Sequence, residues 1–245
     1  MKRRSFLLCS FAGALALAGI PLQAAAASSF TQQMFAASGG ECLRYWLYAP
    51  ENAVDNMPLV VYLHGGSGKG DELSLVTEAE SLPRFLQDGR LAPSCYVIAP
   101  QLPKTCRSWA EKKDALLELL DSVCRQYPID PAKVSLTGHS MGGTGTWELA
   151  LACPERFSAA APLSGSVQTT PANIQKLGSL PIWAVVGGAD TIVDPASSER
   201  FIQILSRSNP SCRITVLDGT DHFSVPAAYL DESLDILGWL TAQSQ

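Results

Sequence analysis

A serine between two glycines stands near the middle of the sequence. Residues 138–142 read Gly-His-Ser-Met-Gly, directly after an apolar run that predicts a strand and before a predicted helix. A serine hydroxyl is a poor nucleophile until a base removes its proton. A sharp strand-to-helix turn lifts the hydroxyl clear of the backbone and directs the helix N-terminus at developing negative charge, and the glycines make room for that turn. We therefore predict that Ser140 is a nucleophile.

A nucleophilic serine needs a histidine as its base, and the sequence offers three. His139 adjoins Ser140, and we expect its ring to point away from the hydroxyl across the turn. His64 ends an early predicted strand, where we expect it to brace a loop. His222 follows the last predicted strand, the position that a Ser, Asp, His order requires. We therefore predict that His222 is the general base.

Two carboxylates follow the predicted strand at residues 182–186, the one before the strand that leads to His222. Asp190 lies closer to the strand end, where a short loop could turn it toward the imidazole, fix its tautomer and stabilise the imidazolium. Asp194 is expected instead to cap the helix that begins near Pro195. Asp221 is too near His222 in sequence for easy alignment. The predicted triad is Ser140, Asp190 and His222.

Negative charge on a substrate oxygen needs two backbone donors. We predict the amide of Met141, directly after the nucleophile, and the amide of Gly66, in the loop after the strand at residues 58–63. Glycines at 65 and 66 let this loop approach a substrate closely. The glycine-rich run at residues 65–70 lacks the spacing of a phosphate-binding loop.

Aromatic residues near these motifs are candidates for substrate contact. We predict that Trp109 and Phe223 line an acyl or aromatic pocket, whereas Trp147 fits such a pocket and the core equally well. No two cysteines have the spacing of a zinc-binding pair, and we predict neither a metal nor a cofactor.

The elements that must position these residues alternate between apolar runs and helical patterns. Continuous apolar strands are typical of a parallel sheet that is covered on both faces. The expected strands are residues 43–48, 58–63, 95–99, 134–137, 159–163, 182–186 and 214–217. The expected helices are one between residues 99 and 134, with a capping box of Ser108 and Glu111, one at 141–153, and one at the chain end with Leu230, Leu234 and Leu237 facing inward.

This order of elements predicts a doubly wound, mostly parallel α/β sheet with helices on both faces, in a single domain over residues 28–245. Fewer than twenty residues separate Leu163 from Ile182, which leaves no room there for a large lid domain. We therefore expect an open site.

The N-terminal segment has the three parts of a secretory signal. Three cations at residues 2–4 precede an apolar run over 6–22 and small residues over 24–28. The paired arginines favour the twin-arginine export pathway, and an ordinary Sec signal is the alternative. We predict that residues 1–27 are a signal peptide, that the mature protein is periplasmic or secreted, and that it does not insert stably into a membrane.

Composition limits the partners of the mature chain. The 245 residues are 47% hydrophobic and 17% charged, which is enough apolar material for one globular core. The net charge is -5, and without the three signal cations it is -8, from 15 cations and 23 acids. An acidic surface disfavours nucleic acid and anionic membranes as partners.

Six cysteines remain after removal of the signal, an even number that permits disulfides in an oxidising compartment. Cys95 opens a predicted strand, and Cys124 lies in the last turn of the helix that follows it. Both would then lie at the same edge of the sheet, so we predict a disulfide between them. Buried free thiols are the alternative for all six.

The chain resembles small α/β-hydrolases of the dienelactone hydrolase and phospholipase/carboxylesterase group. More narrowly, it is similar to bacterial proteins labelled predicted peptidases, which are related to the catalytic domain of prolyl oligopeptidases. The resemblance extends from about residue 58 to 240. It rests on residues 63–71, 99–101, 127–130, 138–147 and 181–184.

The resemblance implies the same triad and places the second oxyanion amide on Gly66. Two positions depart from the pattern of these families: Asp194 stands where proline is usual, and Val186 where histidine is common. Neither belongs to the predicted catalytic set.

These observations predict a metal-independent hydrolase that cleaves small-molecule carboxylic esters with short acyl groups through an acyl-enzyme. A serine peptidase or an acyltransferase on the same fold is the alternative, because ester and amide hydrolysis share this machinery. A binding module that retains an inactive hydrolase fold is a different class of function. The complete Ser140, Asp190, His222 set argues against it.

Overall fold

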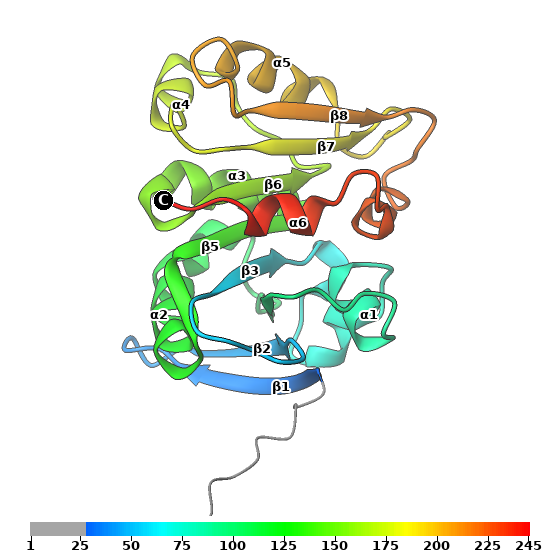
Figure 1. Ribbon diagram of the computed structural model, residues 1–245. Coiled ribbons are helices and arrows are strands. Elements are labelled where there is room, and N and C mark those ends of the chain that lie inside the picture. The colour runs from blue at the N-terminus through cyan, green and yellow to red at the C-terminus, as the bar shows by residue number, and fades with distance from the viewer. Residues whose placement is uncertain (1–27) are drawn as a thin grey trace, which may run out of the picture.

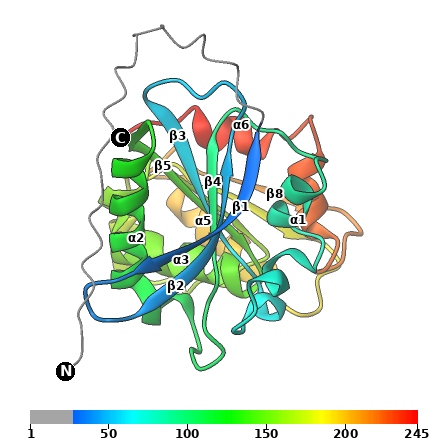
Figure 2. The ribbon, with the colours of Figure 1, turned by 90° about the horizontal axis from the view of Figure 1, so that it is seen from below.

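One eight-stranded sheet runs through the residues that the computed structural model describes, 28–245 (Figure 1). The strands are β1 (Ser29–Ala36), β2 (Cys42–Ala49), β3 (Met57–Leu63), β4 (Tyr96–Pro100), β5 (Ile129–His139), β6 (Ala159–Leu163), β7 (Trp183–Gly187) and β8 (Arg213–Leu217). Their order across the sheet is β1-β2-β4-β3-β5-β6-β7-β8. The β1–β2 and β2–β4 pairs are antiparallel, and all the others are parallel. Figure 2 shows β1 and β2 crossing the strands behind them, which is the ordinary twist of a large sheet.

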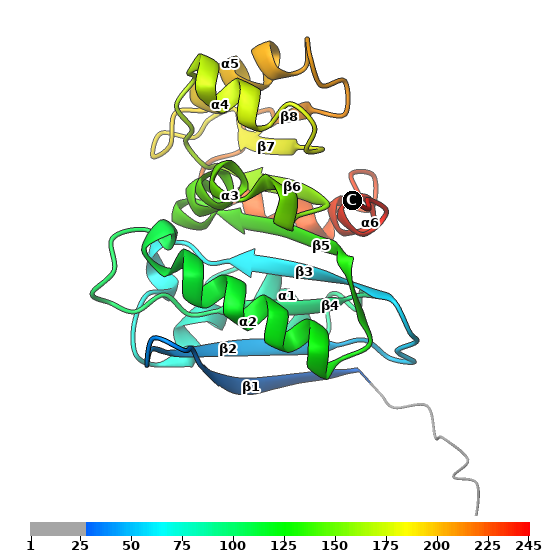
Figure 3. The ribbon, with the colours of Figure 1, turned by 90° about the vertical axis from the view of Figure 1, so that its left-hand side faces the viewer.

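The helices cover both faces of this sheet. They are α1 (Leu82–Gln87), α2 (Lys113–Gln126), α3 (Met141–Ala152), α4 (Pro171–Lys176), α5 (Ala196–Leu205) and α6 (Ile236–Thr241). Apolar side chains of α2, α3 and α5 pack on one face, and those of α1 and α6 pack on the other. Figure 3 shows α2 and α3 on the side of the sheet opposite α6. The predicted fold class, a mostly parallel sheet covered on both faces, is confirmed.

The interior strands form because their side chains are apolar on both faces. Every residue of β4, β6 and β7 is buried, as is every residue of β3 except Pro58. Strand β1, which the sequence analysis missed, is an edge strand with alternating, mostly exposed side chains. Its residue pattern is a weak predictor of a strand. An edge strand pairs with one neighbour only, so few of its side chains have to be apolar.

The pairing between β6 and β7 is short. Leu163 and Val185 are the one pair in register, and an isolated bridge joins Ala160 to Ile182. The amide of Ser164 donates to the carbonyl of Val185 over 2.9 Å. This line divides the sheet into a larger part, β1 to β6, and the pair β7–β8.

The C-terminal helix is shorter than the sequence predicted. Leu230 ends a 3-10 turn over Val225–Leu230, and α6 begins only at Ile236. Asp235 separates the two with a left-handed backbone (φ +45°), and its side chain accepts a hydrogen bond from the Gly238 amide. Leu237 is buried, whereas Leu230 and Leu234 are only partly covered by the core.

The predicted disulfide between Cys95 and Cys124 is wrong. All six cysteines of residues 28–245 are free. Cys95 packs on the face covered by α1 and α6, and Cys124 lies on the face covered by α2. Adjacent residues of a strand point to opposite faces, and it is Tyr96, not Cys95, that faces α2. The two cysteines lie near the same edge of the sheet but on its opposite faces.

No large lid is inserted between β6 and β7, since the segment between them contains only α4. Within residues 28–245, we find no helix with both the length and the apolar character needed to cross a membrane. The predicted signal peptide lies outside the described residues. Export therefore stays a prediction. The mass of the mature protein would show whether residues 1–27 have been removed.

Candidate active site

Ser140 occupies a tight turn between β5 and α3. Its backbone is in the left-handed region (φ +60°, ψ -121°), and its amide donates to the carbonyl of Leu163 over 3.0 Å. A Cβ atom on Gly138 would lie 2.5 Å from the Leu63 carbonyl oxygen, and one on Gly142 would overlap that same oxygen. The turn therefore requires glycine at both positions, because the end of β3 leaves no space for a side chain.

The three predicted triad residues lie in one chain of hydrogen bonds. The Ser140 Oγ lies 2.8 Å from His222 Nε2, and His222 Nδ1 lies 2.7 Å from Asp190 Oδ2. Ser140 follows β5, Asp190 follows β7 and His222 follows β8. Carboxyl ends of parallel strands share one edge of a sheet, which brings together residues that are up to 82 positions apart in sequence.

The carboxylate of Asp190 is held by several donors. Its Oδ1 accepts from the amides of Ile192 and Val193, each over 2.9 Å. Burial raises the pKa of this carboxyl, but the hydrogen bonds from Val193, His222 and Ile192 outweigh it and hold the pKa below its ordinary value. Asp190 is thus ionised at neutral pH and keeps the proton of His222 on Nδ1, so that the Nε2 lone pair faces Ser140.

Asp194 has the capping role expected for it. Its Oδ1 accepts from the amide of Ala196 over 3.0 Å, at the first residue of α5. The carboxylate is therefore engaged at a helix start and makes no hydrogen bond to His222.

Two backbone amides beside Ser140 have no acceptor within residues 28–245: those of Met141 and Gly66. Met141 is the first residue of α3, where amides point out of the helix and the helix dipole is positive. Gly66 begins a 3-10 turn over Gly66–Gly68, directly after β3. A Cβ atom on Gly65 would lie 3.4 Å from the Ser140 Cβ, so this loop and the nucleophile turn are in contact. Both amides are free to donate to a substrate oxygen.

The His64 side chain holds the loop that carries Gly66 through two hydrogen bonds. Its Nδ1–H donates to the Gly65 carbonyl over 2.6 Å, and its Nε2 accepts from the Leu102 amide over 2.9 Å. Burial lowers the pKa of His64 to about 4. A neutral ring in one tautomer satisfies both contacts, and Gly68 packs so closely on it that a Cβ there would lie 2.6 Å from the ring.

Trp109 does not line a pocket, so the prediction that it contacts substrate is wrong. Its side chain is 1% exposed, packs against the His64 ring and donates from Nε1 to the His64 carbonyl over 3.2 Å. Gly145 in α3 is the sequence feature that goes with this packing, because a Cβ atom there would lie 2.5 Å from the Trp109 ring. Trp147 is also buried and packs edge-on against Phe201, so it belongs to the core.

Two exposed apolar side chains lie within two residues of Asp190 or His222 in the sequence. Phe223 is 74% exposed, and its ring lies edge-on to His222 at 5.4 Å between centroids. Ile192 is 63% exposed, two residues after Asp190. Phe223 was predicted to contact substrate. Ile192 was missed, because its exposure depends on the conformation of the Asp190 loop, which the sequence does not reveal.

His139 was excluded as the base, but its contact with His222 was missed. The ring turns toward the base, with 4.7 Å between the two ring centroids, and its Nε2 lies 2.9 Å from the His222 carbonyl oxygen. Burial, followed by the neighbouring His222, lowers the pKa of His139 to about 4.

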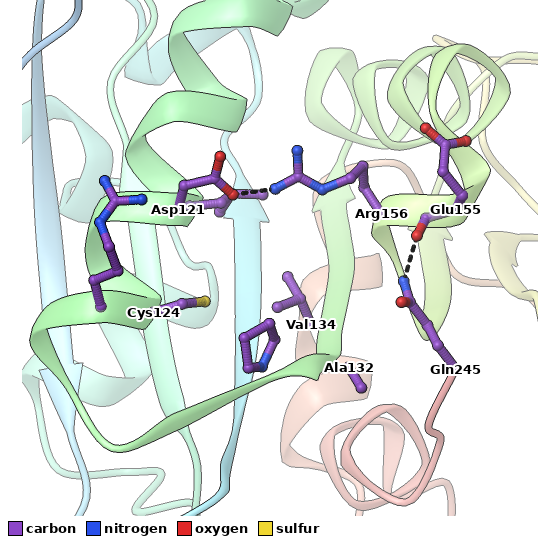
Figure 4. A pocket seen from close by; sticks show the side chains of 10 residues that line it. Asp121, Cys124, Ala132, Val134, Glu155, Arg156 and Gln245 are labelled. Carbon is purple, nitrogen blue, oxygen red and sulfur yellow. Dashed lines mark hydrogen bonds and ion pairs between the residues drawn. The ribbon is translucent and has the colours of Figure 1, made fainter.

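A groove of about 590 Å³ lies at the opposite end of the sheet, between the last turn of α2 and the start of β5 (Figure 4). Asp121 pairs there with Arg156, and the Gln245 side chain donates to the Glu155 carbonyl over 2.7 Å. Burial raises the pKa of Cys124, which also lines the groove, to about 11, so its thiol is protonated at neutral pH. The groove therefore presents no activated nucleophile.

No three His, Cys, Asp or Glu side chains gather in a metal-binding arrangement within the described part of the chain. The chemistry that this site can do with its own groups is nucleophilic attack by Ser140, proton transfer through His222 and stabilisation of an oxyanion by two amides.

Comparison with known proteins gives a consistent family. A model of the Esterase family ("Putative esterase") matches residues 43–227. A bifunctional acetylxylan esterase/xylanase from Neocallimastix patriciarum is 27% identical over 161 residues, which cover 64% of this chain and 23% of that protein. A poly(3-hydroxyalkanoate) depolymerase C from Paucimonas lemoignei is 27% identical over 137 residues, which cover 50% of this chain and 31% of that protein. The chain thus spans less than a third of the length of either relative.

The structural comparison agrees with the sequence comparison. The crystal structure of a thermostable esterase superposes with a TM-score of 0.74 at 26% identity, over 88% of this chain and 63% of that one. The topology is the one that the α/β-hydrolase resemblance led us to expect.

The buried, neutral His64 makes stability depend on pH. Its pKa is about 4 in the folded protein and near 6.5 when solvated, so the unfolded chain binds more protons between these values. Stability should therefore fall as the pH falls from 6.5 to 4, with up to about 3 kcal/mol from this ring. Urea unfolding at pH 4.5 and pH 7 measures the difference.

The His64→Gln variant retains a side chain that can donate and accept but no longer titrates. Its free energy of unfolding should change less between the two pH values than that of the wild type. His139 and Asp190 contribute to the pH dependence of stability with the same sign in both proteins. The difference between the two proteins in this pH dependence therefore isolates His64. An equal change in the free energy of unfolding in both proteins would show that His64 is not held neutral.

Proposed function

The chain belongs to the Esterase family, and we propose that it hydrolyses carboxylic esters through an acyl-enzyme formed on Ser140. The observation that carries this proposal is the hydrogen-bond chain from Ser140 through His222 to Asp190, with lengths of 2.8 and 2.7 Å. In this proposal Ser140 is the nucleophile, His222 is the general base and acid, and Asp190 orients the imidazole.

Acylation begins when His222 Nε2 takes the proton of the Ser140 hydroxyl as Oγ attacks the ester carbonyl carbon. The carbonyl π electrons move to oxygen and give a tetrahedral oxyanion. The imidazolium then gives its proton to the alcohol oxygen as that bond breaks, which leaves the acyl group on Ser140 and releases the alcohol. Asp190, ionised and hydrogen-bonded to Nδ1, stabilises the imidazolium throughout.

Deacylation repeats these steps with water. His222 removes a proton from a water molecule, the hydroxide attacks the acyl carbon, and the oxyanion forms again. The imidazolium returns its proton to Ser140 Oγ as the acyl–oxygen bond breaks, so the free acid leaves and the enzyme is restored. The amides of Met141 and Gly66 donate to both oxyanions. Donors that are already oriented need no reorganisation during the reaction.

The substrate that we propose is a small ester with a short acyl group. With no large lid between β6 and β7, no insertion there would cover a long acyl chain over Ser140. Methylene groups that stay in water contribute no burial energy, which is about 0.8 kcal/mol per group where a pocket exists. Phe223, exposed beside His222, would contact the substrate near the reacting carbon. The acetyl ester in the name of the acetylxylan esterase relative agrees with a short acyl group.

Replacing the nucleophile tests the proposal. Ser140→Ala should lower kcat on p-nitrophenyl acetate by about 10⁴-fold or more and abolish labelling by a fluorophosphonate probe, while the fold remains. Ser166→Ala, which removes an exposed hydroxyl from the loop after β6, should leave activity near that of the wild type. Near-normal turnover by purified Ser140→Ala would refute the assignment.

The two aspartates of the β7–α5 segment separate the catalytic acid from the helix cap. Asp190→Asn should lower kcat on the order of 10⁴-fold, because the amide no longer enforces the productive tautomer of His222. Asp194→Asn should leave kcat nearly unchanged and lower stability slightly through the weakened cap of α5. Steady-state kinetics and urea unfolding of both variants give the comparison. If Asp194→Asn is the crippling change, the triad is wrong.

The acyl preference is measurable with a series of p-nitrophenyl esters. We expect kcat/KM to be highest for acetyl to butyryl esters and to fall by octanoyl. Phe223→Ala should raise KM for these esters, whereas Val54→Ala, which removes a similarly exposed apolar side chain, should not. A steady rise through dodecanoyl esters, or faster cleavage of peptide amides than of matched esters, would overturn the short-acyl proposal.

A further inference from the structure

Two histidines lie side by side at the triad, and the reaction described above uses only one of them. His139 is the last residue of β5 and directly precedes Ser140, whereas His222 comes from the loop after β8. Their rings are 4.7 Å apart between centroids and inclined by 40°. The closest polar contact joins His139 Nε2 to the main-chain carbonyl of His222 over 2.9 Å. Because a carbonyl only accepts, Nε2 carries the proton and donates.

We propose that His139 is a positioning residue, which holds the main chain of His222 so that the imidazole stays in line with the Ser140 hydroxyl. This inference rests on the proposed function, because it takes His222 to be the base. His139 transfers no proton in the reaction. It acts through the backbone of the residue that does.

The loop after β8 has few other attachments near the base. The Thr220 carbonyl accepts from the Ala189 amide over 3.0 Å, which ties the loop to the segment that carries Asp190. Two residues further on, His139 is the sole donor within residues 28–245 to the His222 carbonyl. The His139 side chain thereby links the main chain of this loop to β5, the strand that leads to Ser140. The other hydrogen bonds between residues 218–230 and β5 or Ser140, namely Ser140–His222 and Thr137–Tyr229, join side chains to side chains.

This link matters most after the acyl group has been transferred. In the free enzyme His222 is held at Nδ1 by Asp190 and at Nε2 by the Ser140 hydroxyl. In the acyl-enzyme, Oγ is an ester oxygen and has no proton to give to Nε2. Asp190 and the His139 hydrogen bond then fix the imidazole while it activates water. A loss of His139 should therefore slow deacylation more than acylation.

A neutral donor suits this position. Burial and the neighbouring His222 lower the pKa of His139 to about 4, so the ring is uncharged near neutral pH. It can support His222 without placing a second positive charge beside the imidazolium that forms in the transition state.

The test compares His139→Leu, which fills much of the same volume without a donor, with His139→Gln, whose side-chain amide can donate to the same carbonyl. His139→Leu should lower kcat for p-nitrophenyl acetate by about 100-fold, since small misplacements of a catalytic group have effects of this size. KM should fall with kcat, so that kcat/KM changes less than kcat, because slow deacylation lets the acyl-enzyme accumulate. A burst of p-nitrophenol should become more prominent as deacylation slows. His139→Gln should recover most of the activity.

Ser135→Ala is the matched control. It removes buried hydrogen bonds four residues earlier in β5, from Ser135 Oγ to the Leu240 carbonyl over 2.7 Å and between Ser135 Oγ and Ser158 Oγ over 2.9 Å. It should lower the urea midpoint but leave kcat within about twofold of the wild type. The proposal is overturned if His139→Leu retains wild-type kcat, or if His139→Gln is no better than His139→Leu.

Hydrogen–deuterium exchange gives a readout that does not depend on activity. Exchange of amides at residues 219–224 should be faster in His139→Leu than in the wild type, but not in His139→Gln or Ser135→Ala. If His139→Leu does not fold, His139→Asn, whose amide is too short to reach the carbonyl, takes its place. Unchanged exchange in the donor-free variant overturns the proposal. Failure of a fluorophosphonate probe to label the wild type would instead refute the proposed function, and the exchange experiment would still decide whether His139 holds the loop.

Discussion

The first turn of α3 lies directly against the carboxyl end of β3, and no side chain fits between the two backbones. Gly142 approaches the Leu63 carbonyl so closely that a Cβ atom would overlap it, and Gly138 is nearly as confined. This contact holds Ser140 in its left-handed conformation and keeps the loop that carries Gly66 beside it. The proposed nucleophile and both proposed oxyanion amides are thus positioned by a single backbone packing. Only the proposed acid and base come from elsewhere.

Those features that depend on local sequence could be predicted, and those that depend on side-chain direction could not. The apolar runs of β3 to β7 indicate buried strands without knowledge of their neighbours, and the glycines around Ser140 indicate the turn. The order of residues along the chain indicated Asp190 and His222, which the structure joins to Ser140 by hydrogen bonds. The face on which Cys95 lies depends on the register of β4, which begins at the next residue, and an error of one residue reverses the face. The inward direction of Trp109 depends on a glycine in a helix that packs against it from elsewhere in the chain.

The two histidines outside the proposed reaction have a common physical character. His64 and His139 are both buried, both have a pKa near 4, and both make hydrogen bonds to main-chain groups of catalytic loops. A neutral imidazole can donate and accept at once, and unlike lysine or arginine it brings no charge next to the reacting groups. Each ring is thus hydrogen-bonded to a loop that carries a proposed catalytic group and brings no charge to Ser140 near neutral pH.

The short pairing between β6 and β7 has a consequence for how the protein loses its order. The nucleophile belongs to the larger part of the sheet, whereas Asp190 and His222 follow the two strands beyond this line. Regions with few shared hydrogen bonds open more easily than the core, so we expect the line between β6 and β7 to open before the rest of the sheet. An opening there would take Asp190 and His222 away from Ser140 together. The proposed reaction would then stop while most of the sheet stays folded.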